Sequence, residues 1–472
     1  MGRLSGSLAA IAIISIAYLQ LQKYFVTHKK HVKPAFPRHG YYGPGRYIPD
    51  DERIHTFHIN VSDKVIIDLG QRLRDARISH EQLEDISDFS YGFNKNTLKE
   101  FLHYWKNDYS WKDEEAKINL FSHFTTQIEG LNIHYIHAKP PINKYQRIVP
   151  LLLVHGFPGN FYEFYKLIPL LTDPGLQGLN TMRTAFEVIV PSIPGFGFSE
   201  ASHKSGFDQI ATARIFKKLM VDRLDFLRFV AHGGDWGSLI VSNIAREFPE
   251  HLYGIHLNNI LSVPTIRKTL IQILGSYFPS MMFLFDAPQN YSYKEIFMEK
   301  LFESGYLHIQ ATKPDTVGVA LNDSPIGLMA WILEKFSSLT NKEYRNLPDG
   351  GLEKKFTKDE LLTIVMIYWI NGNILSSQRY YKEFFSHPDR IEFSKEFIDV
   401  PVGVITFPND FGGFQTPAEM FSSVATLKHY KVAEKGGHFA AFEEPVLLAK
   451  DIYEYVGKIV PEYDFEVLVG SV

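Results

Sequence analysis

The sequence predicts an α/β fold with a mostly parallel sheet, and two repeating patterns carry this prediction. Short apolar runs at residues 148–154, 186–190 and 226–231 are each followed by a glycine-containing turn, which is typical of buried parallel strands. Helix-like segments alternate with these runs at residues 162–171, 210–224 and 238–248. The chain therefore contains repeated β-α units.

The alternation of strands and helices stops after Ile260. A strand pattern returns at residues 402–407, and the chain closes with a helix near residues 445–460. We interpret the interruption as a mostly helical cap inserted into the sheet-forming core. Ahead of the core, helix-like stretches at 65–78 and 96–105 and an alternating strand pattern at 131–137 form an N-terminal extension.

The N-terminus is predicted to be a single membrane anchor. Residues 8–21 are apolar except for Ser15 and Gln20, and the apolar character extends to residue 26. The alternative is a cleaved signal peptide, with a weak small-x-small site at residues 15–17. Lysines 23, 29, 30 and 33 follow the segment and one arginine precedes it, so the bulk of the chain is expected on the cytosolic side. The sequons at Asn60, Asn290 and Asn322 would then carry no glycan.

A linker rich in proline and glycine, residues 31–50, separates the anchor from the globular part. The expected organisation is an anchor at 1–26, a linker and N-terminal region at 27–145, the first part of the core at 146–261, the cap at 262–395 and the second part of the core at 396–472.

Composition excludes several classes of protein. Of the 472 residues, 45% are hydrophobic and 22% charged, which are globular values and exclude a polytopic membrane protein. The net charge of −4 provides no basic field for nucleic acid. No cysteine is present, so disulfides, thiolate nucleophiles and cysteine metal sites are excluded. An aromatic content of 14% suits a pocket for apolar ligands.

The candidate nucleophile is Asp235, in Gly233-Gly234-Asp235-Trp236-Gly237. The motif lies between a predicted strand and a predicted helix, the setting of a nucleophile elbow, where flanking glycines permit a sharp turn. A carboxylate that attacks an acyl group gives a high-energy anhydride, whereas attack on a saturated carbon gives an ester that water can cleave. The substrate is therefore expected to be an alkylating agent, such as an epoxide or an alkyl halide.

Two further residues complete a predicted triad. His438, in Gly436-Gly437-His438-Phe439, precedes the final helix and has the position of a catalytic base. Asp410 follows the strand at 402–407 and is the preferred partner to orient His438. Asp389, Asp399 and Glu434 are weaker alternatives.

The loop at residues 155–159, His-Gly-Phe-Pro-Gly, follows the strand at 148–154, where an oxyanion hole is expected. The backbone N–H groups of Phe157 and Trp236 would stabilise the negative charge that develops when water attacks the ester. The alternative for this loop is an ordinary turn.

Together these motifs make the chain similar to the microsomal epoxide hydrolase family, which includes the juvenile hormone epoxide hydrolases. The likeness covers most of the chain, including residues 111–137, 155–159, 233–240, 305–310, 313–316 and 436–445. It implies an α/β-hydrolase fold, a location in the endoplasmic reticulum (microsomal) membrane, and two cap tyrosines that hold the epoxide oxygen, Tyr306 and Tyr381. Tyr380 competes with Tyr381 for this role. The mammalian members carry Glu where this chain has Asp410.

The expected reaction converts an epoxide and water into a vicinal diol without metal or organic cofactor. Its partners are a small apolar epoxide, water and, through the N-terminus, a membrane; no pattern predicts an oligomeric state. Xenobiotic oxides, juvenile hormone and lipid epoxides all fit an apolar pocket. The alternatives are a haloalkane dehalogenase, a catalytically inactive binding protein and, with no serine at the elbow, a serine hydrolase as the least favoured.

Overall fold

A computed structural model describes residues 35–78, 81–175, 178, 183–258, 266–278, 292–410 and 418–460. The predicted anchor at residues 1–26 lies outside these ranges. Within them, no single helix combines the length and apolar character required to cross a bilayer. One bent pair, α12 (Pro314–Asp323) and α13 (Pro325–Ser338), meets the test of length and composition jointly, across a bend of 117°.

A nine-stranded sheet forms the centre of the molecule, in the order β1-β2-β3-β5-β4-β6-β7-β8-β9. The strands from β4 onward pair in parallel, whereas β1, β2 and β3 form an antiparallel edge joined to β5. The predicted α/β fold with a mostly parallel sheet is therefore confirmed. The strands are β1 (His55–Phe57), β2 (His123–Ile128), β3 (Leu131–Ala138), β4 (Arg147–Val154), β5 (Thr184–Pro191), β6 (Phe229–Gly233), β7 (Leu252–Leu257), β8 (Ile398–Thr406) and β9 (Ala425–Val432).

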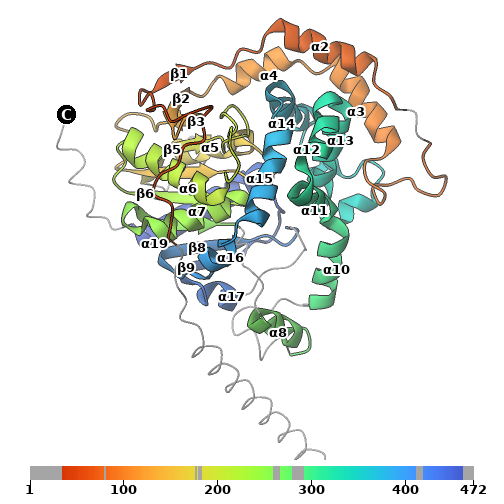
Figure 1. The fold of residues 1–472 in the computed structure, drawn as a ribbon. Helices are drawn as coiled ribbons and strands as arrows, with labels where there is room; N and C mark the ends of the chain where they lie inside the picture. The colour runs from red at the N-terminus through yellow and green to blue at the C-terminus, as the bar shows by residue number, and fades with distance from the viewer. Residues whose placement is uncertain are drawn as a thin grey trace, which may run out of the picture.

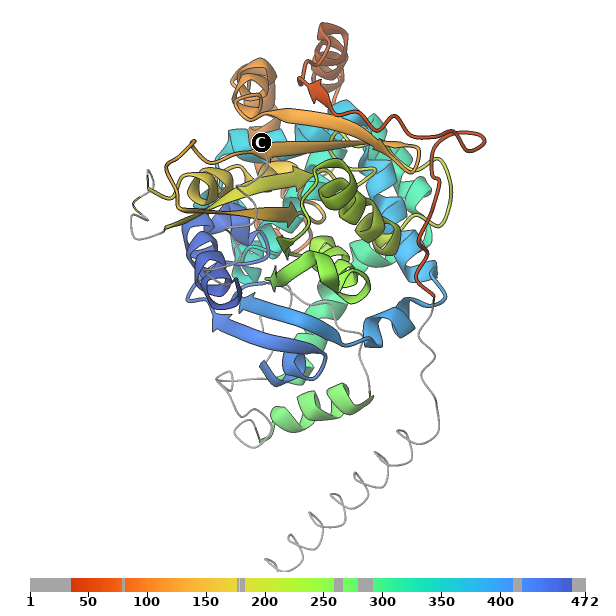
Figure 2. The ribbon, with the colours of Figure 1, turned by 90° about the vertical axis from the view of Figure 1, so that its left-hand side faces the viewer.

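Helices cover both faces of the parallel strands. α5 (Leu167–Thr172) and α19 (Pro445–Ile459) pack together on one face, and α6 (Gln209–Lys217) and α7 (Trp236–Glu247) pack together on the other (Figure 2). The central strands are almost wholly apolar because they are buried on both faces: every residue of β6 and β7 is buried.

A group of helices enters between β7 and β8, and most of them lie beside the sheet, on the right in Figure 1. These are α8 (Ile266–Gly275), α10 (Tyr293–Glu303), α11 (Gly305–Thr312), α12, α13, α14 (Lys358–Asn371), α15 (Ile374–Ser386) and α16 (Arg390–Lys395). The N-terminal helices α2 (Asp63–Arg74), α3 (Lys95–Asn107) and α4 (Trp111–Ile118) arch from the sheet edge onto this group, where they contact α13 and α14.

Several elements differ from the sequence prediction. The helix expected at 162–171 is a 3₁₀ turn, Phe161–Phe164, followed by the short α5. The helix expected at 210–224 is α-helical only to Lys217 and continues as a π-helix, Lys218–Arg223. The strand expected from residue 226 begins at Phe229, because Asp225 has a left-handed φ of 56° that places a turn before it.

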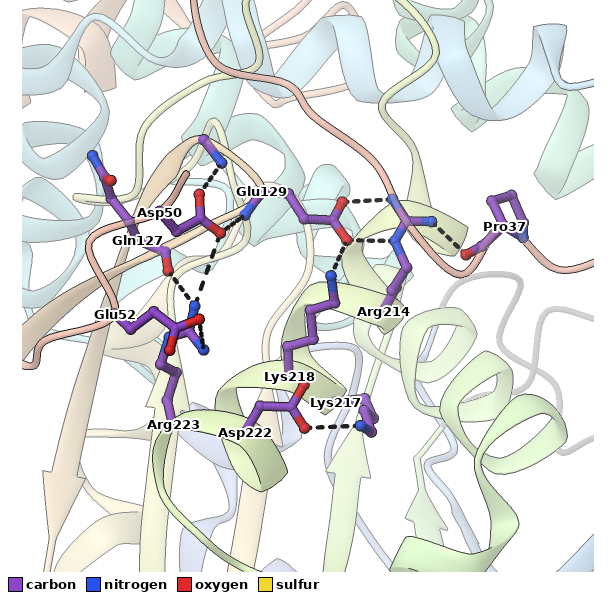
Figure 3. A network of polar contacts seen from close by, with 11 residues as sticks. Pro37, Asp50, Glu52, Gln127, Glu129, Arg214, Lys217, Lys218, Asp222 and Arg223 are labelled. Atoms are coloured by element: carbon purple, nitrogen blue, oxygen red, sulfur yellow. Dashed lines mark hydrogen bonds and ion pairs between the residues drawn. The ribbon is translucent and has the colours of Figure 1, made fainter. Parts of the chain in front are cut away.

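The segment that precedes β1 is attached to the core by hydrogen bonds around a buried ion pair (Figure 3). The guanidinium of Arg214, on α6, contacts both carboxylate oxygens of Glu129 at 2.6 Å and also donates to the Pro37 carbonyl at 2.9 Å. The side chains of Arg214 and Glu129 are each 2% exposed. Asp50 accepts hydrogen bonds from the Glu129 and Gly130 N–H groups at 2.7 Å. These charge-assisted bonds attach the arm, residues 35–53, to the β2–β3 turn.

Candidate active site

The turn between β6 and α7 carries Asp235 in a strained backbone conformation, with φ 49° and ψ −125°. Its flanking glycines are required by close packing. A Cβ on Gly237 would lie 2.0 Å from the Val154 carbonyl oxygen, and one on Gly233 would lie 2.4 Å from the Gly237 carbonyl carbon. Any side chain at either position would force the turn apart. The turn therefore has the geometry expected of a nucleophile elbow, at the carboxyl end of a central strand.

The loop after β4 contacts the carboxylate of Asp235. The Phe157 N–H donates to Asp235 Oδ1 at 2.8 Å. A Cβ on Gly156 would lie 2.3 Å from the same oxygen, so glycine is needed there. Of the two predicted oxyanion donors, Phe157 therefore points at the candidate nucleophile. No hydrogen bond from the Trp236 N–H to this carboxylate occurs in the described part of the chain.

His438 lies between the two carboxylates predicted for it. Its Nε2 is 3.4 Å from Asp235 Oδ2, and its Nδ1 is 2.6 Å from Asp410 Oδ1. The alternative partners lie elsewhere: Asp399 is exposed on β8, Glu434 is exposed after β9, and Asp389 caps α16. Burial lowers the pKa of His438, but the two carboxylates outweigh burial and raise it well above its ordinary value.

The loop that carries His438 is held by a residue that the sequence did not reveal. The Gly437 and Phe439 N–H groups donate to the two carboxyl oxygens of Glu443 at 2.8 and 2.9 Å, and the His438 N–H donates to the Leu339 carbonyl at 3.1 Å. Burial raises the pKa of Glu443 to about 8. Glu443 therefore fixes the backbone on both sides of the base. In the sequence, Glu443 is distinguished only by its position five residues after His438.

Tyr306 on α11 and Tyr381 on α15 reach the same region from the inserted helices. Their ring centroids lie 6.3 and 5.5 Å from that of Phe157, and 6.3 Å from each other. Burial raises the pKa of both phenols, and the charge of Asp235 raises each further. Both are therefore protonated hydrogen-bond donors at neutral pH.

Tyr380, the competitor of Tyr381, points its hydroxyl elsewhere. The Tyr380 oxygen lies 2.8 Å from the Thr212 hydroxyl, on α6. Its ring packs edge-on against Trp236 at 5.2 Å. Because its hydroxyl is already bonded on the core side, Tyr381 is the better candidate to face a ligand at Asp235.

Besides His232 on β6, two more polar residues line the cavity shared by Asp235 and His438, and sequence reasoning missed them. They are Glu163, in the 3₁₀ turn after β4, and Asn258, at the end of β7. No local motif distinguishes either residue, because only the folded sheet brings the two strand ends together.

One group of side chains in the described part of the chain has the spacing of a metal site: His429, Asp451 and Glu454. Two cations already contact it. Lys458 Nζ lies 2.8 Å from His429 Nδ1, and Lys431 Nζ lies 3.3 Å from Asp451 Oδ1. The arrangement is therefore an ion-pair cluster rather than a cation site.

Comparison with known proteins gives consistent matches. Residues 54–164 match the family described as epoxide hydrolase N terminus, and residues 149–403 match the alpha/beta hydrolase fold. Epoxide hydrolase 1 of Sus scrofa is 49% identical over 89% of this chain and 92% of its own length. Juvenile hormone epoxide hydrolase 2 of Ctenocephalides felis is 42% identical over 93% of each chain. The crystal structure of juvenile hormone epoxide hydrolase from Bombyx mori superposes with a TM-score of 0.83 at 38% identity, over 90% of this chain and 99% of that one.

Proposed function

The chain belongs to the epoxide hydrolase family, and from that premise we propose that it opens epoxides to vicinal diols through a covalent ester on Asp235. One observation carries the mechanism. The Asp235 carboxylate has the Phe157 N–H on one oxygen and His438 on the other, and the rings of Tyr306 and Tyr381 pack against the ring of Phe157. These are the groups that nucleophilic attack, leaving-group protonation and ester hydrolysis require.

In the first step, a carboxylate oxygen of Asp235 attacks one ring carbon and the ring C–O bond breaks. The electron pair of that bond passes to the epoxide oxygen, and Tyr306 and Tyr381 supply a hydrogen bond and a proton to it. A phenol can protonate this oxygen because an alkoxide is far more basic than a phenolate. The raised pKa values of both phenols keep the protons in place until the ring opens.

In the second step, His438, oriented by Asp410, takes a proton from water, and the water oxygen attacks the carbonyl carbon of the ester. The Phe157 N–H then stabilises the developing oxyanion. Esterification removes the negative charge of Asp235, one of the two charges that raise the pKa of His438. The pKa therefore falls once the ester forms, and the imidazole can pass its proton to the phenolate and become the base for the second step.

Replacing Tyr306 or Tyr381 with phenylalanine tests the first step. Each change should slow ester formation by about 10²-fold or more, because it removes a positioned proton donor. Stopped-flow or rapid-quench measurement of a single turnover isolates this rate. Tyr380→Phe is the matched control: it removes a hydroxyl from the adjacent position, where the group bonds to Thr212, and should leave ester formation close to that of the unchanged enzyme. A large loss for Tyr380→Phe and none for Tyr381→Phe would reverse the assignment.

The substrate class that we propose is an apolar epoxide, such as a xenobiotic oxide, juvenile hormone or a lipid epoxide. Aromatic side chains around Asp235 support it: the Trp236 ring contacts Tyr381 and Phe384 at 4.7 and 5.1 Å, and Phe157 contacts both tyrosines. Comparing kcat/KM for styrene oxide, juvenile hormone and an epoxy fatty acid tests this class. Equal, low values for all three would contradict it.

We further propose that residues 1–26 anchor the protein in the endoplasmic reticulum membrane with the catalytic part in the cytosol. The apolar run at 8–21 and the lysines after it support this orientation. The full chain should stay with membranes during a carbonate wash, whereas a chain lacking residues 1–30 should be released with unchanged kcat. Release of the full chain, or a glycan on the exposed Asn60, would contradict the proposal.

A further inference from the structure

A small cavity adjoins the candidate nucleophile on the side of His438. Its volume is about 20 Å³, and its polar lining comes from Asp235, His438, Glu163, Asn258 and His232. A single water molecule needs roughly 10–15 Å³ of such volume and two to four polar partners. The cavity therefore has room for one water beside both the atom to be attacked and the base.

Glu163 directs a carboxyl group into this space. A Cβ on Gly159 would lie 1.9 Å from Glu163 Oε2. The carboxyl group of Glu163 can therefore occupy this position because residue 159 has no side chain. Within the described part of the chain, the carboxyl of Glu163 accepts no hydrogen bond. Burial raises the pKa of Glu163 to about 8. The charge of His438 lowers this pKa and the charge of Asp235 raises it, so Glu163 interacts electrostatically with both side chains.

Asn258 brings a buried acceptor without a protein partner among the described residues to the same cavity. The residue is 7% exposed, and its Oδ1 has no hydrogen-bond partner in the described part of the chain. A Cβ on Gly234 would lie 2.2 Å from this oxygen, so Asn258 packs directly against the backbone beside Asp235. Buried polar atoms in folded proteins are nearly always bonded to protein or to ordered water. The unsatisfied Asn258 oxygen, with the half-buried Glu163 carboxyl beside it on a water-sized cavity, indicates a water site.

We propose that this cavity binds the hydrolytic water, and that Glu163 and Asn258 are positioning residues for the second step. One O–H of the water donates to His438 Nε2, the other donates to an oxygen of Glu163 or Asn258, and a lone pair of the water points at the ester carbon. The water oxygen then bonds to that carbon, one proton passes to His438, and the bond between that carbon and the substrate oxygen breaks as the released alkoxide takes up this proton from His438. This assignment rests on the ester mechanism proposed above.

Glu163→Ala, Glu163→Gln and Asn258→Ala in the full chain test the assignment. With radiolabelled styrene oxide and acid quench, the rates of ester formation and ester hydrolysis are measured separately in a single turnover. Glu163→Ala should slow hydrolysis about 10- to 100-fold, the effect of one lost hydrogen bond to a buried group, and should leave ester formation nearly unchanged. Glu163→Gln retains a carbonyl oxygen and should recover most of that loss. Asn258→Ala removes the other acceptor independently and should also slow ester hydrolysis rather than ester formation.

A purely structural role for Glu163 predicts a different result, namely a lower melting temperature and a parallel loss in both steps. Parallel loss, unchanged hydrolysis in Glu163→Ala, or a Glu163→Gln enzyme as slow as Glu163→Ala would overturn the inference. His438→Gln separates this failure from that of the ester mechanism. If His438→Gln accumulates ester and Glu163→Ala hydrolyses it normally, only the water site is wrong; if no variant accumulates ester, the mechanism itself is wrong.

Discussion

Asp235→Ala should lower the turnover of styrene oxide by at least about 10⁴-fold, the scale on which loss of a catalytic nucleophile acts in hydrolases. Without the carboxylate, the phenols and the Phe157 N–H remain, but nothing in the site can form the ester. Steady-state kinetics measures the loss directly. Asp399→Ala is the matched control, because this carboxylate is exposed on β8 and should be dispensable for activity.

The route of oxygen decides whether Asp235 acts covalently. In a single turnover in heavy-oxygen water with enzyme in excess, an Asp235 carboxylate oxygen becomes the new diol oxygen and water restores the carboxylate. The diol should therefore be largely unlabelled and the peptide that contains Asp235 should carry the label. A fully labelled first-turnover diol with an unlabelled peptide would instead assign Asp235 an electrostatic or general-base role.

His438→Gln should slow ester hydrolysis by about 10³-fold or more while ester formation continues. The first step needs the carboxylate and the phenols, whereas the second needs a base within reach of water, which glutamine does not provide. The ester should accumulate and be recovered by mass spectrometry on the Asp235 peptide. His203→Gln, a change at an exposed histidine paired with Glu200, is the control.

Equal losses in both steps of the His438→Gln enzyme, with no ester on the Asp235 peptide, would remove His438 from its role as the base. The Asp410→Ala enzyme offers a second test of the same pair, because His438 Nδ1 lies 2.6 Å from Asp410. Its loss should fall on ester hydrolysis as well.

The positions of Asp235 on the turn after β6 and of His438 beside it could be predicted from the sequence because glycines mark both segments. The turn that carries Asp235 requires glycine at positions 233 and 237, and this spacing can be recognised in the sequence. Tyr306 and Tyr381 could not be chosen in this way. The chain has 25 tyrosines with the same side-chain chemistry, so only the resemblance to a family singled out these two.

Glu163, Asn258 and Glu443 could not be predicted, because their roles depend on tertiary neighbours. A buried carboxylate is unusual only once its burial is known, and Asn258 reaches the cavity only because β7 pairs beside β6. The edge strand β1 was missed for a similar reason. It has three residues, two of them exposed, and its pairing with β2 rather than its own pattern makes it a strand.

The buried ion pair between Arg214 and Glu129 bears on where the folding unit of this protein begins. The family match at the N-terminal side starts at residue 54, yet Pro37 and Asp50 supply hydrogen bonds to that pair and to the turn that carries it. Phe36 also packs edge-on against Phe248 at 5.4 Å. The family-model boundary at residue 54 therefore lies inside the folding unit: a chain begun there would leave Arg214 with an unused donor in a buried site, whereas one begun at residue 35 keeps the contacts of Phe36, Pro37 and Asp50.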